Sequence, residues 1–108
     1  MLHKAHNYIP NHFREPIELN YLTSLSNVSA EHFCRLFKNT FYLTPFEYIT
    51  NLRMQEAKKL LAYTNYNISK IGHDVGYKSP SYFIHVFKAH TFMTPTEFRK
   101  TNNILKKP

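Results

Sequence analysis

Apolar residues recur at steps of three and four along this chain, the spacing expected for one face of an α-helix. Such a stripe in the first stretch predicts a helix over residues 2–13. Its members are Leu2, Ala5, Ile9 and Phe13. No stretch alternates apolar and polar residues as a half-buried strand does, so we expect an all-α fold.

Residues that favour helix starts divide the rest of the chain. Thr44 can cap a helix with its hydroxyl, and Pro45 then occupies the first helical position, where no amide hydrogen is needed. Glu47, three residues after Thr44, supplies the acid of a capping box. The helix that begins there is expected to run to about Tyr63 without an internal Gly or Pro. Further helices are expected at about 18–25, after Ser29 to about 40, after Asn67 through Val75, after Ser79 to about 90, and after Thr94, about seven in all.

The same periodicity predicts which side chains face the core. The inward residues of the second helix are expected to be Leu19, Leu22 and either Leu25 or a neighbour of it. Those of the third are expected to be Phe33, Leu36 and Phe37, and those of the sixth Phe83, Val86 and Phe87. Gly76 is placed to end the fifth helix with a left-handed residue.

The chain also contains an internal repeat. Residues 29–48 return as residues 79–98, with seven of the twenty positions identical. A short helix, a tight turn and a capped longer helix form the helix-turn-helix pattern, which occurs here at 19–40 and again at 68–90. We therefore expect a first helix-turn-helix lobe at 1–43, a linker helix at 44–63, and a second lobe with a C-terminal helix at 64–108.

With the phenylalanines inside, the longer helix of each lobe presents its other face to solvent. The expected outward residues of the first are Ala30, Glu31, Cys34, Arg35 and Lys38, and those of the second are Pro80, Ser81, Ile84, His85 and Lys88. At ~1.5 Å per residue the linker helix should be about 28 Å long. Major grooves on one face of B-DNA recur every ~34 Å, so two such helices could reach successive grooves.

Composition supports a polyanionic partner. The 108 residues carry a formal net charge of +7, which favours nucleic acid. No apolar run is long enough to cross a bilayer, and a single cysteine fits a reducing, cytoplasmic setting. Only two glycines are present, which argues against glycine-rich phosphate loops. No catalytic set, metal site or cofactor is expected, because carboxylates are scattered and His3 and His6 are the one close pair of possible ligands.

Two segments carry a resemblance to a known family. Residues 53–61 (RMQEAKKLL) look like the linker helix, and residues 71–88 (IGHDVGYKSPSYFIHVFK) resemble the signature segment, of the DNA-binding domain of AraC/XylS-type transcription regulators. The resemblance covers about residues 2–100. It implies a bacterial regulator with two helix-turn-helix lobes that binds promoter DNA and commonly activates transcription through RNA polymerase.

By position, the resemblance also implies which residues contact DNA. Base edges would be met by Glu31, Cys34 and Arg35 in the first lobe and by Pro80, Ser81, Ile84 and His85 in the second. Phosphates would be met by Lys78, Tyr82 and Lys88, and the remaining interface residues are Ser29, Ala30, Lys38 and Ser79.

The chain departs from the family pattern at several positions. The family usually has Gly where Tyr42 and Phe92 stand, a small Ala where Thr23 and Gly72 stand, and Arg where His85 stands. We expect the two aromatics to turn their helix ends without glycine, and Gly72 to loosen its helix slightly.

The residues leave several alternatives open. Glu31 either faces DNA or only favours the helix dipole, and Cys34 is either a small filler at the groove or a reactive thiol. The second lobe, with few polar groups on its outer face, either reads DNA or docks on a protein partner. The isolated domain is expected to be monomeric, with a dimeric full-length regulator left open.

Overall fold

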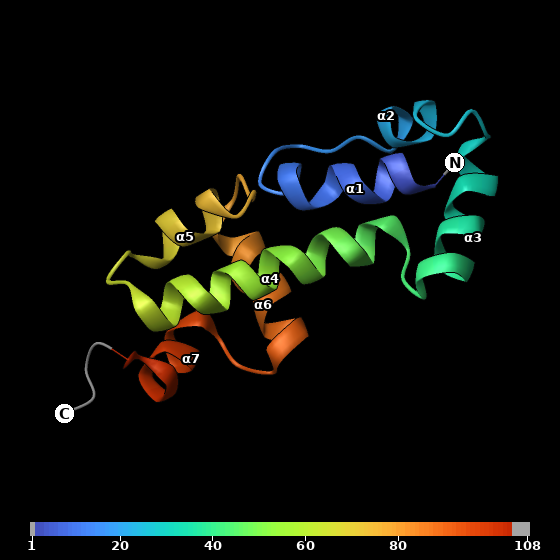
Figure 1. The fold of residues 1–108 in the computed structure, drawn as a ribbon. Helices are drawn as coiled ribbons and strands as arrows, with labels where there is room; N and C mark the ends of the chain where they lie inside the picture. Colours follow the sequence, from blue (N-terminus) through green and yellow to red (C-terminus); the bar gives the residue numbers. More distant parts are fainter. Residues whose placement is uncertain (1, 105–108) are drawn as a thin grey trace. The chain divides into compact units, whose positions relative to one another are not determined.

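The computed structural model describes residues 2–104, and the described part contains helices and no strand (Figure 1). The predicted all-α fold is confirmed. The helices are α1 (His3–His12), α2 (Leu19–Ser24), α3 (Ala30–Phe41), α4 (Pro45–Tyr63), α5 (Ile68–Asp74), α6 (Pro80–Thr91) and α7 (Pro95–Asn102).

The predicted helix starts are present as hydrogen bonds. Ser29 Oγ accepts from the backbone N–H of His32 at 3.2 Å, and Ser79 Oγ accepts from that of Tyr82 at 3.2 Å. Asn67 caps α5 in the same way by accepting from the Lys70 N–H at 2.8 Å. Each bond satisfies an amide that the first helical turn leaves without a partner.

Both predicted capping boxes are also formed. Thr44 Oγ1 accepts from the Glu47 N–H at 3.1 Å, while Glu47 Oε1 accepts from the Thr44 N–H at 2.9 Å. Thr94 and Glu97 repeat the arrangement at 3.1 and 2.8 Å. The pKa of each glutamate lies below its usual value, mainly because the threonine N–H donates to the ionised carboxylate.

The chain forms two compact units, one ending at Leu52 and the other beginning at Arg53, within α4. Each unit has its own apolar core. The core of unit 1 is built from Ala5, Ile9, Phe13, Leu22, Phe33, Phe37 and Ile49. The core of unit 2 is built from Met54, Ala57, Leu61, Ile71, Val75, Tyr77, Phe83 and Phe87. The division into lobes 1–43 and 64–108 with a separate linker at 44–63 stays a prediction.

One core expectation is wrong. Leu19 is 41% exposed, whereas Leu22 in the same helix is 1% exposed. Leu19 and Leu22 share one side of this six-residue helix, but Leu19 is its first residue and lines an open apolar pocket beside Leu22 instead of reaching the core. Leu25 packs at the edge of the core, and Leu36 is only partly buried.

Unit 1 places its histidines among aromatic rings. The ring of His6 is stacked between Phe41, at 4.0 Å between centroids, and Tyr48, at 4.9 Å. His3 meets Phe41 edge-on at 6.3 Å. Within residues 2–104 no group of three His, Cys, Asp or Glu side chains could hold a metal ion. The ring contacts therefore account for the one close histidine pair as packing.

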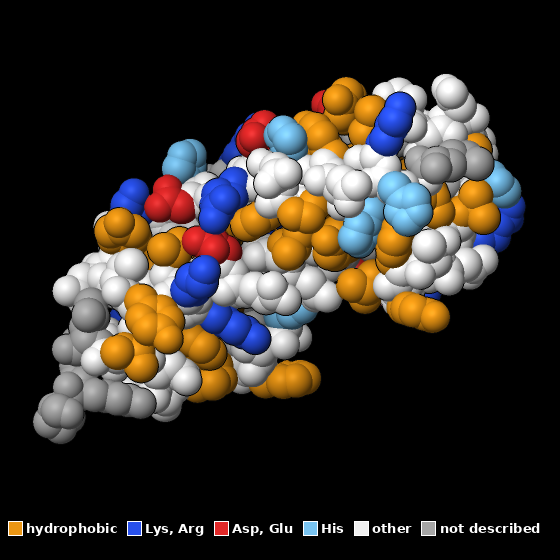
Figure 2. Space-filling model, viewed as in Figure 1, with side chains coloured by type: hydrophobic (Ala, Val, Ile, Leu, Met, Phe, Trp, Pro, Cys, Tyr) orange, Lys and Arg blue, Asp and Glu red, His pale blue; other side chains and the backbone are white. Residues whose placement is uncertain are grey.

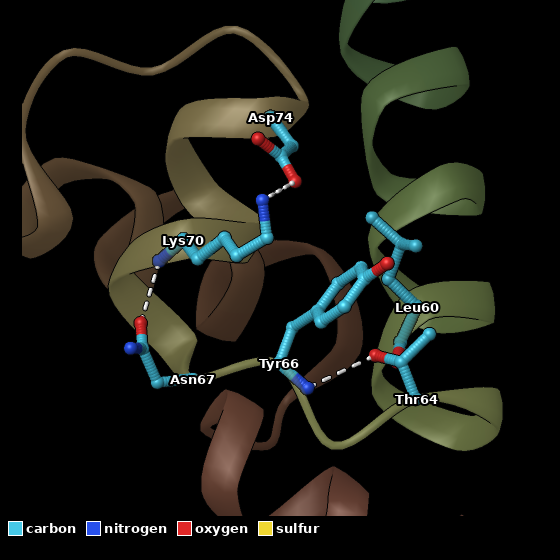
Figure 3. Close-up of polar contacts among 6 residues, drawn as sticks. All are labelled: Leu60, Thr64, Tyr66, Asn67, Lys70 and Asp74. Carbon is cyan, nitrogen blue, oxygen red and sulfur yellow. Dashed lines mark hydrogen bonds and ion pairs between the residues drawn. The ribbon is translucent and has the colours of Figure 1, made fainter.

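In unit 2, side chains close the turn from α4 to α5 (Figure 3). Thr64 Oγ1 donates to the Leu60 carbonyl at 2.6 Å and accepts from the Tyr66 N–H at 3.2 Å. From α7, Arg99 donates to the carbonyls of Leu61 at 3.1 Å and Thr64 at 3.2 Å. A cation is thus bonded to the negative end of α4, where carbonyls lack helical partners.

Gly72 has a role that the sequence did not indicate. A Cβ atom at this position would lie 2.8 Å from Cδ2 and 3.0 Å from Cβ of Phe83. The ring of Phe83 is fully buried and has little room to move. Gly72 therefore lets α6 pack closely on α5. This close packing stabilises unit 2 and offsets the lower helix propensity that glycine brings to α5.

Two non-glycine residues end the longer helices in the left-handed conformation. Tyr42 ends α3 with φ 68°, and Phe92 ends α6 with φ 64°. Their side chains are 85% and 88% exposed. Left-handed backbone costs an L-residue roughly 1–2 kcal/mol, and these side chains recover little of it by burial.

We expect Tyr42→Gly and Phe92→Gly each to raise the free energy of unfolding, by about 0.5–1 kcal/mol, because relief of strain exceeds the entropy that glycine adds to the unfolded chain. Thermal and urea denaturation measure this. The control Thr40→Gly, at an exposed right-handed position of α3, should lower it by roughly 0.3–0.5 kcal/mol, the difference in helix propensity between threonine and glycine. Equal losses at all three positions would contradict the prediction.

Gly72→Ala should lower the free energy of unfolding by up to about 2 kcal/mol, because overpacking against Phe83 exceeds the gain in helix propensity. Urea denaturation provides the measurement. Ser69→Ala, an exposed change in the same helix, should leave stability equal or slightly higher. A stabilised Gly72→Ala protein would show that the ring of Phe83 yields easily.

Candidate nucleic-acid interface

Each unit contains the elements of a helix-turn-helix. In unit 1, α2 contacts α3, and in unit 2, α5 contacts α6. The inner face of α3 buries Phe33 and Phe37 completely, and the inner face of α6 buries Phe83 and Phe87. Because these rings hold one face of each helix in a core, the opposite face is available to a ligand.

The outer face of α3 carries most of the expected residues. Ser29, Glu31, Arg35 and Lys38 are exposed, and Ala30 is partly exposed. The hydroxyl of Ser29 is already used as the helix cap. Exposed donors and one carboxylate thus lie along a single helix.

Cys34 is less accessible than the exposed residues of this face, and its role at DNA stays a prediction. It is partly buried and packs against the core of unit 1. It also lines an apolar pocket of about 210 Å³, together with residues before and within α2 and at the start of α4. The lining residues are Ile17, Leu19, Leu22, Cys34, Thr44, Pro45, Phe46 and Ile49. One residue after Phe33, the helix still turns its side chain toward α2, so Cys34 acts as a spacer beneath α3.

Arg35 has a partner that sequence reasoning missed. Its guanidinium donates to Nδ1 of His32 at 3.0 Å, which requires an unprotonated nitrogen there. The partner in this bond is His32 and not the neighbouring Glu31. The spacing of three residues on one helix was the available signal. His32 thereby limits the freedom of the longest donor on α3.

The outer face of α6 has a different chemistry. Every expected residue on it is exposed, namely Lys78, Ser79, Pro80, Ser81, Tyr82, Ile84, His85 and Lys88. Ile84 is 38% exposed, whereas Cys34 at the equivalent position packs inward. The face offers an apolar side chain, a hydroxyl and an imidazole, and cations only at its two ends.

Tyr82 supports this face through ring contacts. Its centroid lies 5.8 Å from that of buried Tyr77 in an edge-on arrangement and 6.3 Å from that of His85. The tyrosine therefore connects the exposed imidazole to the core of unit 2.

Both faces match what a DNA major groove can accept. Guanidinium and imidazole donate to base edges, an aliphatic side chain suits a thymine methyl group, and lysines suit phosphates. The positive ends of α3 and α6 add partial charge next to these groups. No helix within residues 2–104 is long and apolar enough to cross a membrane.

Comparison with known proteins agrees with this geometry. Residues 22–101 match the family of the helix-turn-helix domain. The chain is 33% identical over 97 residues to the uncharacterized HTH-type transcriptional regulator YdeC of Bacillus subtilis, covering 90% of this chain and 33% of that protein. It is 33% identical over 95 residues to the lactose operon transcription activator of Staphylococcus xylosus, covering 88% of this chain and 34% of that protein.

A solved structure gives the same result at the level of the fold. The C-terminal domain of AraT, a response regulator from Geobacillus stearothermophilus, is similar with a TM-score of 0.90 at 29% identity, covering 99% of this chain and 89% of that one. The chain spans about a third of the length of the two curated relatives. On the match over residues 22–101 and on its fold, the chain belongs to the AraC/XylS-type helix-turn-helix family, as a DNA-binding domain of transcription regulators.

Proposed function

We propose that α3 and α6 are recognition helices that enter successive major grooves of one promoter duplex and read its sequence. The observation that carries the proposal is the pair of exposed outer faces at equivalent positions of the repeat, with Arg35 matched by His85 and Lys38 by Lys88. At ~1.5 Å per residue the 19 residues of α4 extend about 28 Å, which is comparable with the ~34 Å groove repeat.

The side chains divide into readers and phosphate contacts. Arg35 can donate two bonds to O6 and N7 of one guanine, and Ile84 can meet a thymine methyl group. Ser81 and His85 are the hydrogen-bonding readers of α6, and Pro80 completes the apolar contact. Lys38, Lys78, Tyr82 and Lys88 position the helices on phosphates, with Ser29, Ala30 and Ser79 at the helix starts.

The remaining interface residues have smaller roles. Glu31 either accepts from a cytosine N4 group or serves the helix dipole. Cys34 supports α3 from below, in keeping with its packing against the core. The proposal includes no catalytic step and no cofactor.

At the level of the cell, the domain would act in the bacterial cytoplasm and influence transcription through contact with RNA polymerase. The isolated domain would bind as a monomer, because it carries both reading helices. These statements rest on family membership and on the size of the match.

Selection of bound duplexes from a random pool should return two short preferred blocks about one helical turn apart, because each helix reads one groove. Sequencing of the bound fraction is the measurement. A single block would show that only one helix reads bases, and a pool without preference would contradict sequence-specific binding.

On a selected duplex, Arg35→Ala should remove roughly 1–3 kcal/mol of discrimination at one base pair, because a bidentate guanine contact is lost. Lys38→Ala is the matched control. It should weaken binding to all duplexes alike, and the slope of log affinity against log salt should become less steep by about 0.9, because one phosphate contact is lost. Fluorescence anisotropy at several salt concentrations separates the two.

His85→Ala tests the second helix in the same assay. Loss of discrimination in the other block would support reading by α6. Unchanged discrimination and affinity would instead favour α6 as a docking surface for a protein.

A further inference from the structure

Tyr42 and Phe92 are large aromatic residues at the same place in both units. Each directly follows its longer helix in left-handed backbone, with φ and ψ of 68° and 7° for Tyr42 and of 64° and 14° for Phe92. Their exposed fractions, 85% and 88%, exceed those of the other exposed large hydrophobic residues. Figure 2 shows hydrophobic side chains at the surface of the molecule among charged and polar ones.

Stability of the fold does not account for an aromatic ring at these positions. Glycine adopts left-handed backbone without steric cost, and an exposed ring returns little burial energy. Neither ring has an aromatic or cationic partner among the described residues. Strain retained without an internal gain points to a contact outside the molecule.

The position of the two rings indicates which contact this is. Glu31, Arg35 and Lys38 follow one another at steps of four and three along α3, and Tyr42 is the next residue at a step of four. In α6 the same steps lead through Ser81, His85 and Lys88 to Phe92. At 100° per residue the helical positions of each series share one face, and the aromatic residue follows directly after the end of the helix.

The backbone places each aromatic residue directly after the helical turn that carries the lysine. The Tyr42 N–H donates to the Lys38 carbonyl at 2.8 Å, and the Phe92 N–H donates to the Lys88 carbonyl at 2.8 Å. Each aromatic residue therefore follows a lysine by one turn, at the C-terminal end of a helix proposed to face DNA.

The length of the helices then indicates which part of the duplex the two aromatic residues would meet. Each has 12 residues and is about 18 Å long, whereas the major groove is ~12 Å wide. A helix with its first turns among the bases extends beyond the groove edge, where deoxyribose and phosphate alternate. A phosphate suits the lysine, and the apolar face of a deoxyribose suits the ring beside it.

We propose that Tyr42 and Phe92 pack against deoxyribose groups at the groove edge and thereby position the two recognition helices on DNA. This inference rests on the proposed function, since it requires α3 and α6 to lie in major grooves. It adds an apolar contact, independent of base sequence, to the polar ones already assigned.

The test uses the whole 108-residue chain and a selected duplex. Tyr42→Gly and Phe92→Gly should each bind about three- to tenfold more weakly, as expected for loss of an apolar contact of some 25–55 Å². The slope of log affinity against log salt should stay that of the parent, because no phosphate contact is lost. Both variants should also melt at a higher temperature than the parent, so weaker binding would not reflect unfolding.

Two further variants make the result specific. Tyr42→Ala removes the ring but keeps an L-residue in left-handed backbone, so it should bind as weakly as Tyr42→Gly without the gain in melting temperature. Tyr63→Ala removes a 60% exposed aromatic from the end of α4 and should keep the parent's affinity.

The outcomes separate this inference from the proposed function. If Arg35→Ala loses base discrimination while the glycine variants bind like the parent, the inference is overturned and the rings serve a protein surface instead. If the parent shows no base discrimination to lose, the proposed function itself fails. Weaker binding with a reduced salt slope would also overturn the inference, because it would mean a lost phosphate contact.

Discussion

The burial of paired phenylalanines on α3 and α6 is the constraint on which the rest of the structure depends. Phe33 and Phe37 in one unit, and Phe83 and Phe87 in the other, are fully buried. Rings four residues apart occupy one side of a helix, so their burial fixes the rotation of that helix about its axis. The residues proposed to meet DNA are those that this rotation leaves outside.

The two outer faces differ because the units use equivalent positions differently. Cys34 packs partly against the core of unit 1 and lines a pocket, whereas the equivalent Ile84 is exposed on the surface of α6. Arg35 is bonded to His32 on its own helix, whereas His85 is linked to the core through Tyr82. The two units repeat one scaffold, but their outer faces differ in chemistry: α3 carries a carboxylate and two cations, whereas α6 carries an aliphatic side chain, a hydroxyl and an imidazole between lysines.

The C-terminal ends of α3 and α6 combine left-handed backbone with exposed aromatic rings. Within a few residues, each unit passes from a left-handed aromatic residue to a capping box that starts the next helix. The capping box stabilises the turn locally, which allows a strained residue to be retained beside it. Each unit thereby presents an exposed aromatic residue at the C-terminal end of its longer helix.

Local features of the structure were predictable from the sequence because they depend on neighbouring residues. The caps at Ser29, Asn67 and Ser79, the Thr44 and Thr94 capping boxes and the buried phenylalanines all follow from short spacings. The exposed outer faces follow from the same periodicity, apart from Cys34.

Only the tertiary structure decided the contacts between distant segments. Exposure of Leu19, the bonds from Arg99 to the end of α4, the stacking of His6 and the close approach of Phe83 to Gly72 depend on which helices pack together and at what distance. Helical periodicity gives the direction of a side chain from its own axis, but not what it meets there. What it meets depends on how the side chains of two helices fill the space between them at close packing.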